Sequence, residues 1–144
     1  MTKSINALLT ISFIFIAYST IYAQNEHIGL WKGNDQGQVG YINFDTLGSA
    51  YFIIDGDTLG GESYTVDEIE LYMKYEMNYT KPFNTLDFIF YLKDNDTEFL
   101  RMPAIFKFNE QDRLILCINF ETEERPKSFK DGDSVQLEKV NLEV

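Results

Sequence analysis

The chain has 144 residues and carries 23 acidic against 12 basic side chains, giving a formal net charge of −11 at pH 7. Because phosphate backbones and anionic membrane surfaces repel a polyanion, this charge argues against nucleic-acid binding and against adhesion to such membranes. The single cysteine excludes an internal disulfide, and the length is enough for one domain with its own core but not for two.

The first 23 residues have the pattern of a cleavable signal peptide. A short segment containing Lys3 precedes an uncharged stretch from Ala7 to Ala23, whose strongly apolar part is shorter than the about 20 residues that a membrane span needs. Ala23 supplies the small residue before cleavage at Gln24, and no cysteine near this junction offers a site for a lipid. An uncleaved N-terminal anchor is the alternative. We expect a soluble secreted or periplasmic protein with a mature domain at 24–144, not inserted in a membrane after cleavage and of undetermined oligomeric state.

Beyond this leader, apolar and polar residues alternate with the period of two that is typical of β-strands. The clearest stretch is 69–77, where an extended strand gathers all the alternating apolar side chains on one face. Clusters of Asp, Asn and Gly between the stretches predict turns, and no stretch of convincing length has the pattern of an amphipathic helix. The expected strands are 28–32, 38–44, 49–54, 62–66, 69–77, 86–92, 98–109, 114–120 and 134–140.

Short connections between successive strands favour an antiparallel meander, and closing it removes the exposed edges. We predict an all-β fold, a single antiparallel up-and-down barrel of about eight or nine strands. A barrel of about eight strands is just wide enough to be filled by its own side chains or to hold one small ligand, and both versions stay open. The alternation directs a set of side chains into the interior as candidate ligand-binding residues: Ile42, Phe44, Leu71, Met73, Tyr75, Phe88 and Phe90.

Asp87 is a further candidate for the lining, because it lies between two apolar residues of a strongly apolar strand. If its face points into the barrel, it would hold a polar group of a ligand or pair with Arg101; if the face is outside, it is a solvated carboxylate. Arg101 and Lys107 alternate with the apolar residues of the predicted strand 98–109, so we expect both side chains on the outer face. Cys117 lies in an apolar run, which predicts a buried thiol.

The sequence offers little for catalysis or metal binding. His27 is the single histidine, expected to be frayed or at a barrel mouth, and no serine or cysteine has a nucleophile's setting beside it. One histidine and one cysteine do not fill a zinc shell without several carboxylates. The segment 55–62 lacks most ligands of a calcium loop and predicts a hairpin turn. We expect no enzyme, no metal and no cofactor.

Two segments resemble a known group of barrels. Gly29-Leu30-Trp31-Lys32 matches the Gly-x-Trp that opens the first strand of lipocalin and avidin-like barrels. The apolar run 114–118 followed by Glu124-Arg125-Pro126-Lys127-Ser128-Phe129 is similar to the end of a family of uncharacterised bacterial lipocalin-like, calycin-type secreted domains. The resemblance covers most of 28–140 and implies that Gly29, Trp31 and a basic side chain, Arg125 or Lys139, close one end of the barrel.

This resemblance implies a fold and little about activity. The chain is shorter than a full lipocalin and lacks its C-terminal helix, and a single tryptophan argues against biotin. The leading hypothesis is a secreted lipocalin-like protein that binds a small apolar or amphipathic ligand inside the barrel. The alternative is a protein-interaction module with a packed barrel, such as a secreted inhibitor or a component of an envelope complex.

Overall fold

The computed structural model describes residues 25–141. The predicted signal peptide and its cleavage point therefore lie outside the described residues. Between 25 and 141 the chain forms strands and loops without a helix, which confirms the predicted all-β class. None of these residues belongs to a helix that is long and apolar enough to span a membrane.

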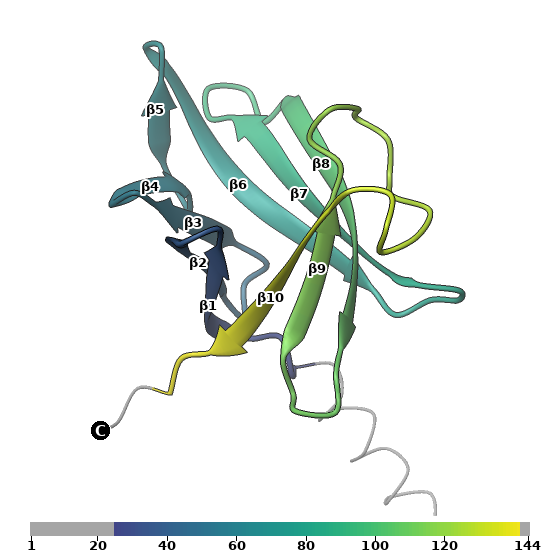
Figure 1. The fold of residues 1–144 in the computed structure, drawn as a ribbon. Helices are drawn as coiled ribbons and strands as arrows, with labels where there is room; N and C mark the ends of the chain where they lie inside the picture. The colour runs from purple at the N-terminus through teal and green to yellow at the C-terminus, as the bar shows by residue number, and fades with distance from the viewer. Residues whose placement is uncertain (1–24, 142–144) are drawn as a thin grey trace, which may run out of the picture.

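The strands form one antiparallel sheet of ten strands, rather than the eight or nine expected (Figure 1). The sheet curls into a nearly closed barrel. In chain order the strands are β1 (Gly29–Asp35), β2 (Gln38–Phe44), β3 (Ala50–Ile54), β4 (Asp57–Gly60), β5 (Tyr64–Val66), β6 (Ile69–Asn78), β7 (Asn84–Leu92), β8 (Glu98–Phe108), β9 (Leu114–Ile118) and β10 (Asp133–Lys139).

The additional strand is β4, in a segment that we expected to be a turn between 49–54 and 62–66. The turn consists only of Asp55 and Gly56, both with positive φ. β4 then pairs with β3, starting where Asp57 faces Ile54 and ending where Gly60 faces Tyr51. Its sequence, Asp-Thr-Leu-Gly, is too short and too rich in turn-forming residues to show a period of two. Backbone pairing with β3 therefore forms this strand despite its sequence.

The sheet is a meander whose two terminal strands, β1 and β10, are hydrogen-bonded to each other. The edges of the sheet are β4 and β5, and they meet where the barrel closes. There the Met73 N–H donates to the Gly61 carbonyl and the Tyr75 N–H to the Gly48 carbonyl, each over 2.9 Å. At the neighbouring Gly60, with φ of +100°, a Cβ would lie 2.6 Å from Met73 Cε. Only glycine allows this close approach.

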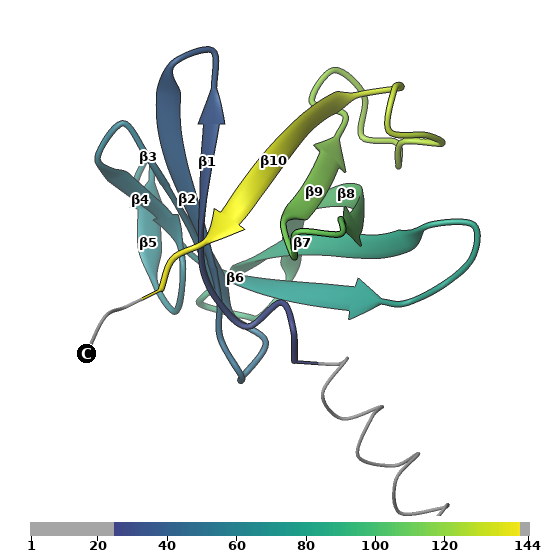
Figure 2. The same ribbon diagram turned by 60° about the horizontal axis from the view of Figure 1, so that its bottom comes forward.

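The meander places its turns alternately at two ends. One end, which we call the open end, carries the turns at 36–37, 55–56, 67–68 and 93–97 and the long loop 119–132. The other end, which we call the closed end, carries the segment 25–28 before β1 and the turns at 45–49, 79–83 and 109–113. β1 and β10 diverge from each other toward the open end (Figure 2). Their pairing runs from Trp31–Lys139 only as far as Gly33–Leu137.

The core lies inside the barrel and is rich in aromatic side chains. Phe44 stacks on Phe88 at 6.0 Å between ring centroids, and Phe52 lies 4.8 Å from Phe88. The buried members of the cluster come from every long strand: Trp31, Ile42, Phe44, Ala50, Met73, Leu86, Phe88, Phe90, Ala104, Phe106, Leu114, Leu116, Ile118 and Leu137.

The loop 119–132 lies against the outside of the wall around β8 and β9. Cys117 is fully buried, as its sequence context predicted, although it alternates with the core residues Leu116 and Ile118. Its thiol donates to the Ser128 carbonyl at 3.8 Å. Pro126 of the same loop is buried too. The loop therefore gives part of the barrel wall a second apolar layer on its outer side.

Candidate functional site

The barrel holds a cavity of about 510 Å³ at its open end. Residues from both halves of the meander line it, so it exists only once β1 to β5 have folded against β7 to β10. The lining is Gly33, Asp35, Gln38, Val39, Gly40, Tyr41, Ile42, Phe52, Ile54, Leu59, Tyr64, Val66, Phe90, Met102, Leu116, Ile118, Phe120, Asp133, Ser134, Val135 and Leu137.

The rim of this cavity is apolar and exposed. Four aliphatic side chains next to the turns are 39% to 47% exposed, and Phe120 at the start of the loop 119–132 is 68% exposed. Single exposed apolar side chains are common on monomeric proteins, but a group of them around one cavity marks a binding surface. The aliphatic members are Val39, Ile54, Leu59 and Val66.

The floor of the cavity is formed by partly and fully buried side chains, including Ile42, Phe90 and Leu116. Below them the barrel is filled: Phe106 and Trp31 are almost completely buried, and Phe108 lies 5.9 Å from Trp31. Aromatic rings fill the lower part of the interior, whereas the upper part, between Phe52, Phe90 and Leu116, holds the cavity. The barrel is thus packed at one end and hollow at the other.

The structure separates the interior residues expected from the sequence into two groups. Ile42 and Phe90 line the cavity. The others lie outside its lining: Phe44, Met73 and Phe88 are in the packed core, Tyr75 packs against that core, and Leu71 is buried beside Tyr64 and Leu92 of the neighbouring strands. Alternation along a strand indicates which face is inside, but it does not indicate the depth at which the packing stops.

Most of the rim was not foreseen in the sequence. Val39, Ile54, Val66 and Phe120 each lie within two residues of a turn or at the beginning of a loop. In a meander, every second turn meets at the same end of the barrel. In the sequence, the signal for the open end of the cavity was therefore an apolar residue beside every second predicted turn.

Polar groups at the mouth are few. Asp35, Gln38, Asp133 and Ser134 lie at the ends of β1, β2 and β10, and the Tyr64 ring packs 6.2 Å from Phe90. Burial raises the pKa of the Tyr64 hydroxyl to about 12. These groups offer hydrogen bonds to the polar end of a molecule whose apolar part fills the cavity.

Asp87 is not part of the lining and lies on the outer face of the wall. Neither of the two alternatives considered for it describes its position: it is outside, yet only 13% exposed and ion-paired twice. Arg101 Nη1 lies 2.9 Å from Asp87 Oδ2, and Arg125 Nη2 lies 2.6 Å from Asp87 Oδ1. Arg101 also binds Glu98 through two 2.9 Å hydrogen bonds.

Arg125 therefore lies elsewhere than at the barrel end, where the resemblance placed it. It reaches from the loop 119–132 to Asp87 and donates a 2.8 Å hydrogen bond to the Ala104 carbonyl. Glu-Arg-Pro in this chain anchors the loop to the outer wall. The basic side chain beside Trp31 comes from Lys139, the other candidate, which directly faces Trp31 across the β1–β10 pairing.

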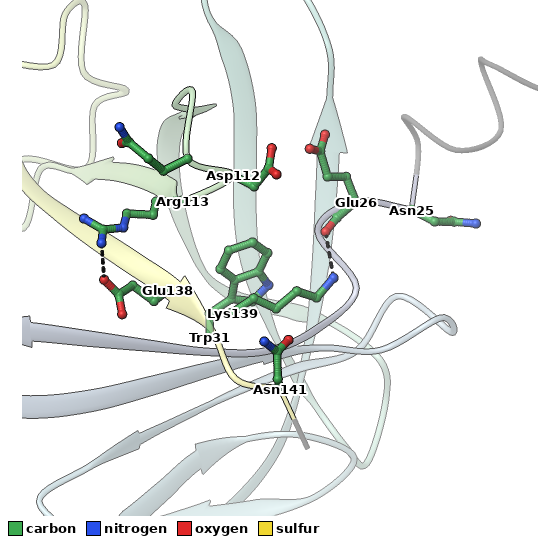
Figure 3. Close-up of a pocket in the computed structure, with 9 residues that line it drawn as sticks. Asn25, Glu26, Trp31, Asp112, Arg113, Glu138, Lys139 and Asn141 are labelled. Carbon is green, nitrogen blue, oxygen red and sulfur yellow. Dashed lines mark hydrogen bonds and ion pairs between the residues drawn. The ribbon is translucent and has the colours of Figure 1, made fainter. Parts of the chain in front are cut away.

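Trp31 closes the packed end, and the Lys139 side chain lies beside its indole ring (Figure 3). The indole N–H donates to the His27 carbonyl at 2.7 Å, and Lys139 Nζ lies 5.4 Å from the centre of the ring. Lys139 also donates to the Glu26 carbonyl at 3.1 Å. A Cβ at Gly29, where φ is +121°, would lie 3.1 Å from Lys139 Cε, so glycine gives the lysine stem room to pass.

His27 is buried at this closed end, and our expectation of a frayed residue or one at the mouth is wrong. The Tyr75 hydroxyl donates to the Asp45 carbonyl at 2.7 Å, so it accepts from His27 Nε2 at 3.0 Å and assigns the proton to that nitrogen. Nδ1 is buried without a partner. Burial, and then the charge of Lys139, lower the pKa of His27 and keep the ring neutral.

A second, shallow depression of about 1030 Å³ lies outside the closed end and is the one drawn in Figure 3. Its two cations are already engaged, since Arg113 pairs with Glu138 at 2.8 Å and Lys139 binds the Glu26 carbonyl. The depression is more open to solvent than the cavity at the open end and therefore encloses less of a ligand. Across residues 25–141, no three His, Cys, Asp or Glu side chains come together as metal ligands would.

Comparisons of the chain with protein-family models, with curated proteins and with solved structures gave no match. The geometry described above is therefore the basis for assigning a function.

Proposed function

We propose that this protein is a secreted, lipocalin-like up-and-down barrel that binds a small apolar or amphipathic molecule in the cavity at its open end. The observation that carries the proposal is the combination of an apolar cavity with a rim of exposed aliphatic and aromatic side chains. A volume of about 510 Å³ lies within the range of small-molecule sites, which are typically apolar with a few polar groups at fixed places.

The export route rests on the sequence. The apolar stretch before Gln24 is a signal peptide by its length and flanking charge, and it supports release into the periplasm or the medium. An exported barrel without a disulfide depends on its core for stability. The packed aromatic end supplies that core and leaves the other end free for a ligand.

The binding test starts with the protein purified from its own host and examined by native mass spectrometry for a bound small molecule. The second measurement is titration with Nile red, a neutral apolar dye whose emission rises in apolar surroundings. We expect one dye molecule to bind per chain. A chain that is empty from its host and leaves the dye unaffected would contradict ligand binding and favour the protein-interaction alternative.

A pair of variants locates the dye. Ile54→Lys places a charge on the rim at a side chain that is 47% exposed, so the fold should tolerate it while the cavity loses apolar contact. Leu47→Lys is the matched control, because Leu47 is 76% exposed in the turn 45–49 at the closed end. We expect about tenfold weaker dye binding for Ile54→Lys and no change for Leu47→Lys. If the natural protein, Ile54→Lys and Leu47→Lys bind the dye with equal affinity, the dye binds outside the cavity.

A further inference from the structure

The charges around the cavity distinguish between kinds of ligand. The lining contains two acidic residues, Asp35 and Asp133, and no Lys, Arg or His. Neither carboxylate takes part in any of the ion pairs of residues 25–141. A ligand that fills the cavity therefore presents its polar end to unpaired negative charge.

Both carboxylates lie where β1 and β10 separate. The pairing of these strands ends at Gly33–Leu137, and beyond it the two strands separate toward the open end (Figure 2). Asp35 is the last residue of β1 and Asp133 the first of β10, so both lie beyond the paired part. Asp35 lies on the same face of β1 as Gly33, and Asp133 lies on the same face of β10 as Val135. Both of these neighbours line the cavity. The two carboxylates therefore border the mouth on the side where the wall opens.

The surrounding turns add charge of the same sign. The four short turns of the open end carry Asp55, Asp67, Glu68, Asp94 and Asp96, and their single cation is Lys93. Lys93 is already close to Glu70, at 3.6 Å, and donates to the Glu62 carbonyl at 3.0 Å. The mouth thus combines an apolar interior with a negative border, and a cation entering it meets no positive charge in the lining.

We propose that the ligand is a cationic amphiphile: an apolar chain or ring system that fills the cavity, with an ammonium-type group at the mouth, attracted by the negative charge of Asp35 and Asp133. This inference rests on the proposed function and specifies its ligand class. A fatty-acid anion would bring its carboxylate to a mouth that already carries two exposed carboxylates, and like charges repel.

Three probes with the same twelve-carbon chain test the proposal: dodecyltrimethylammonium, dodecanoate and neutral dodecanol, each below its aggregation limit. Isothermal titration calorimetry at low ionic strength compares their affinities for the processed protein. We expect the ammonium probe to bind at least about tenfold more tightly than dodecanoate, with dodecanol in between. Added salt should weaken the ammonium probe most.

Two double variants with the same change of net charge separate the mouth from the whole acidic surface. Asp35→Asn with Asp133→Asn should bring the ammonium and carboxylate probes to within about threefold of each other. Glu110→Gln with Asp112→Asn, in the turn 109–113 at the closed end, should leave the preference as it is in the natural protein. Circular dichroism and thermal unfolding verify that both proteins are folded.

The outcomes separate this inference from the function on which it rests. If dodecanol binds in the cavity but the ammonium probe has no advantage over dodecanoate, the cationic ligand is excluded and ligand binding stands. If the preference persists in the Asp35/Asp133 variant, or is lost equally in the control, the mouth carboxylates do not select the ligand and the inference is wrong. If no probe binds, the proposed function fails as well.

Discussion

Arg125 Nη2 lies 2.6 Å from Asp87 Oδ1, and this ion pair fastens the loop 119–132 to the outer wall of the barrel. The same guanidinium donates to the Ala104 carbonyl, so the arginine is bound at two places on the wall. The loop begins at the rim residue Phe120 and closes over Cys117. The Asp87–Arg125 pair thus connects the shape of the mouth with the covering of the outer face.

Replacing either partner should destabilise the protein. For Asp87→Ala we expect a loss of about 2 kcal/mol in the free energy of unfolding, because two guanidinium groups lose a nearly buried carboxylate. Arg125→Ala should cost about 1 kcal/mol, since this side chain is more exposed. Urea unfolding of the single and double variants gives a coupling energy, expected to be about 1 kcal/mol.

Arg113→Ala is the control for this experiment. Arg113 also makes a short ion pair, at 2.8 Å from Glu138, but both side chains are exposed, so its loss should change stability by at most about 0.5 kcal/mol. Additive effects of Asp87→Ala and Arg125→Ala would show that the contact between them contributes nothing. Faster tryptic cleavage after Lys127 or Lys130 in Arg125→Ala would report the released loop directly.

Phe88→Ala should enlarge the cavity toward the packed end. Phe88 is fully buried between Phe44 and Phe52, just below the cavity floor, so its removal should cost about 3–5 kcal/mol. If the folded variant binds Nile red, it should also bind a bulkier apolar dye that the natural protein excludes. Phe88→Leu, which keeps most of the volume, should lose less stability and keep the original size limit. Identical size limits for both variants would show that Phe88 does not form a barrier below the cavity.

The buried His27 predicts a decrease of stability in mild acid. Its pKa in the folded protein is lower than the ordinary value of 6.5, because burial and the nearby Lys139 disfavour the charged ring. Well above pH 6.5 the ring is neutral in both states and contributes no pH dependence. As the pH falls from 6.5 toward the folded pKa, only the unfolded chain takes up a proton, so stability is lost in that window.

Comparison with His27→Gln isolates this contribution from those of the carboxylates. Glutamine keeps a donor toward the Tyr75 hydroxyl and does not titrate. The free energy of unfolding, measured by urea at pH 7.5 and pH 5.5, should fall further for the natural protein than for the variant. Equal decreases would show that His27 takes up its proton as readily in the folded protein as in the unfolded chain.

The Cys117 thiol should be unreactive in the native protein. It is fully buried under the loop 119–132 and donates to the Ser128 carbonyl. A thiol reagent such as DTNB should label it slowly in buffer and at once in denaturing urea. In Arg125→Ala, labelling should become faster if the loop opens as a unit. Rapid labelling of the natural protein would contradict the packing of this loop.

Much of the fold could be predicted from the sequence because alternation is a local property. The strands β2 and β6 agree closely with the predicted ranges, and Cys117 is buried as its apolar neighbours indicated. The strand predicted at 114–120 ends instead at Ile118, and Phe120 leaves the sheet to reach the rim. A pattern of alternating residues does not reveal where a partner strand stops.

The candidate site was harder to predict, because it depends on distant parts of the chain. Asp35 and Asp133 have nothing in common in the sequence, and they border one mouth only because β1 and β10 pair and then diverge. Asp87 and Arg125 likewise meet only when the loop 119–132 folds back over the wall. Neither contact has a local signature.

The sequence by itself determined the all-β class, the alternation of inner and outer faces, the acidic surface and the burial of the one thiol. These follow from the period of two and from composition, which are local properties of the chain. Only the tertiary structure decided how deep the aromatic packing reaches, that Lys139 and not Arg125 covers Trp31, and which residues surround the cavity. Those features depend on strand register and on the closure of the meander, which bring together residues far apart in the chain.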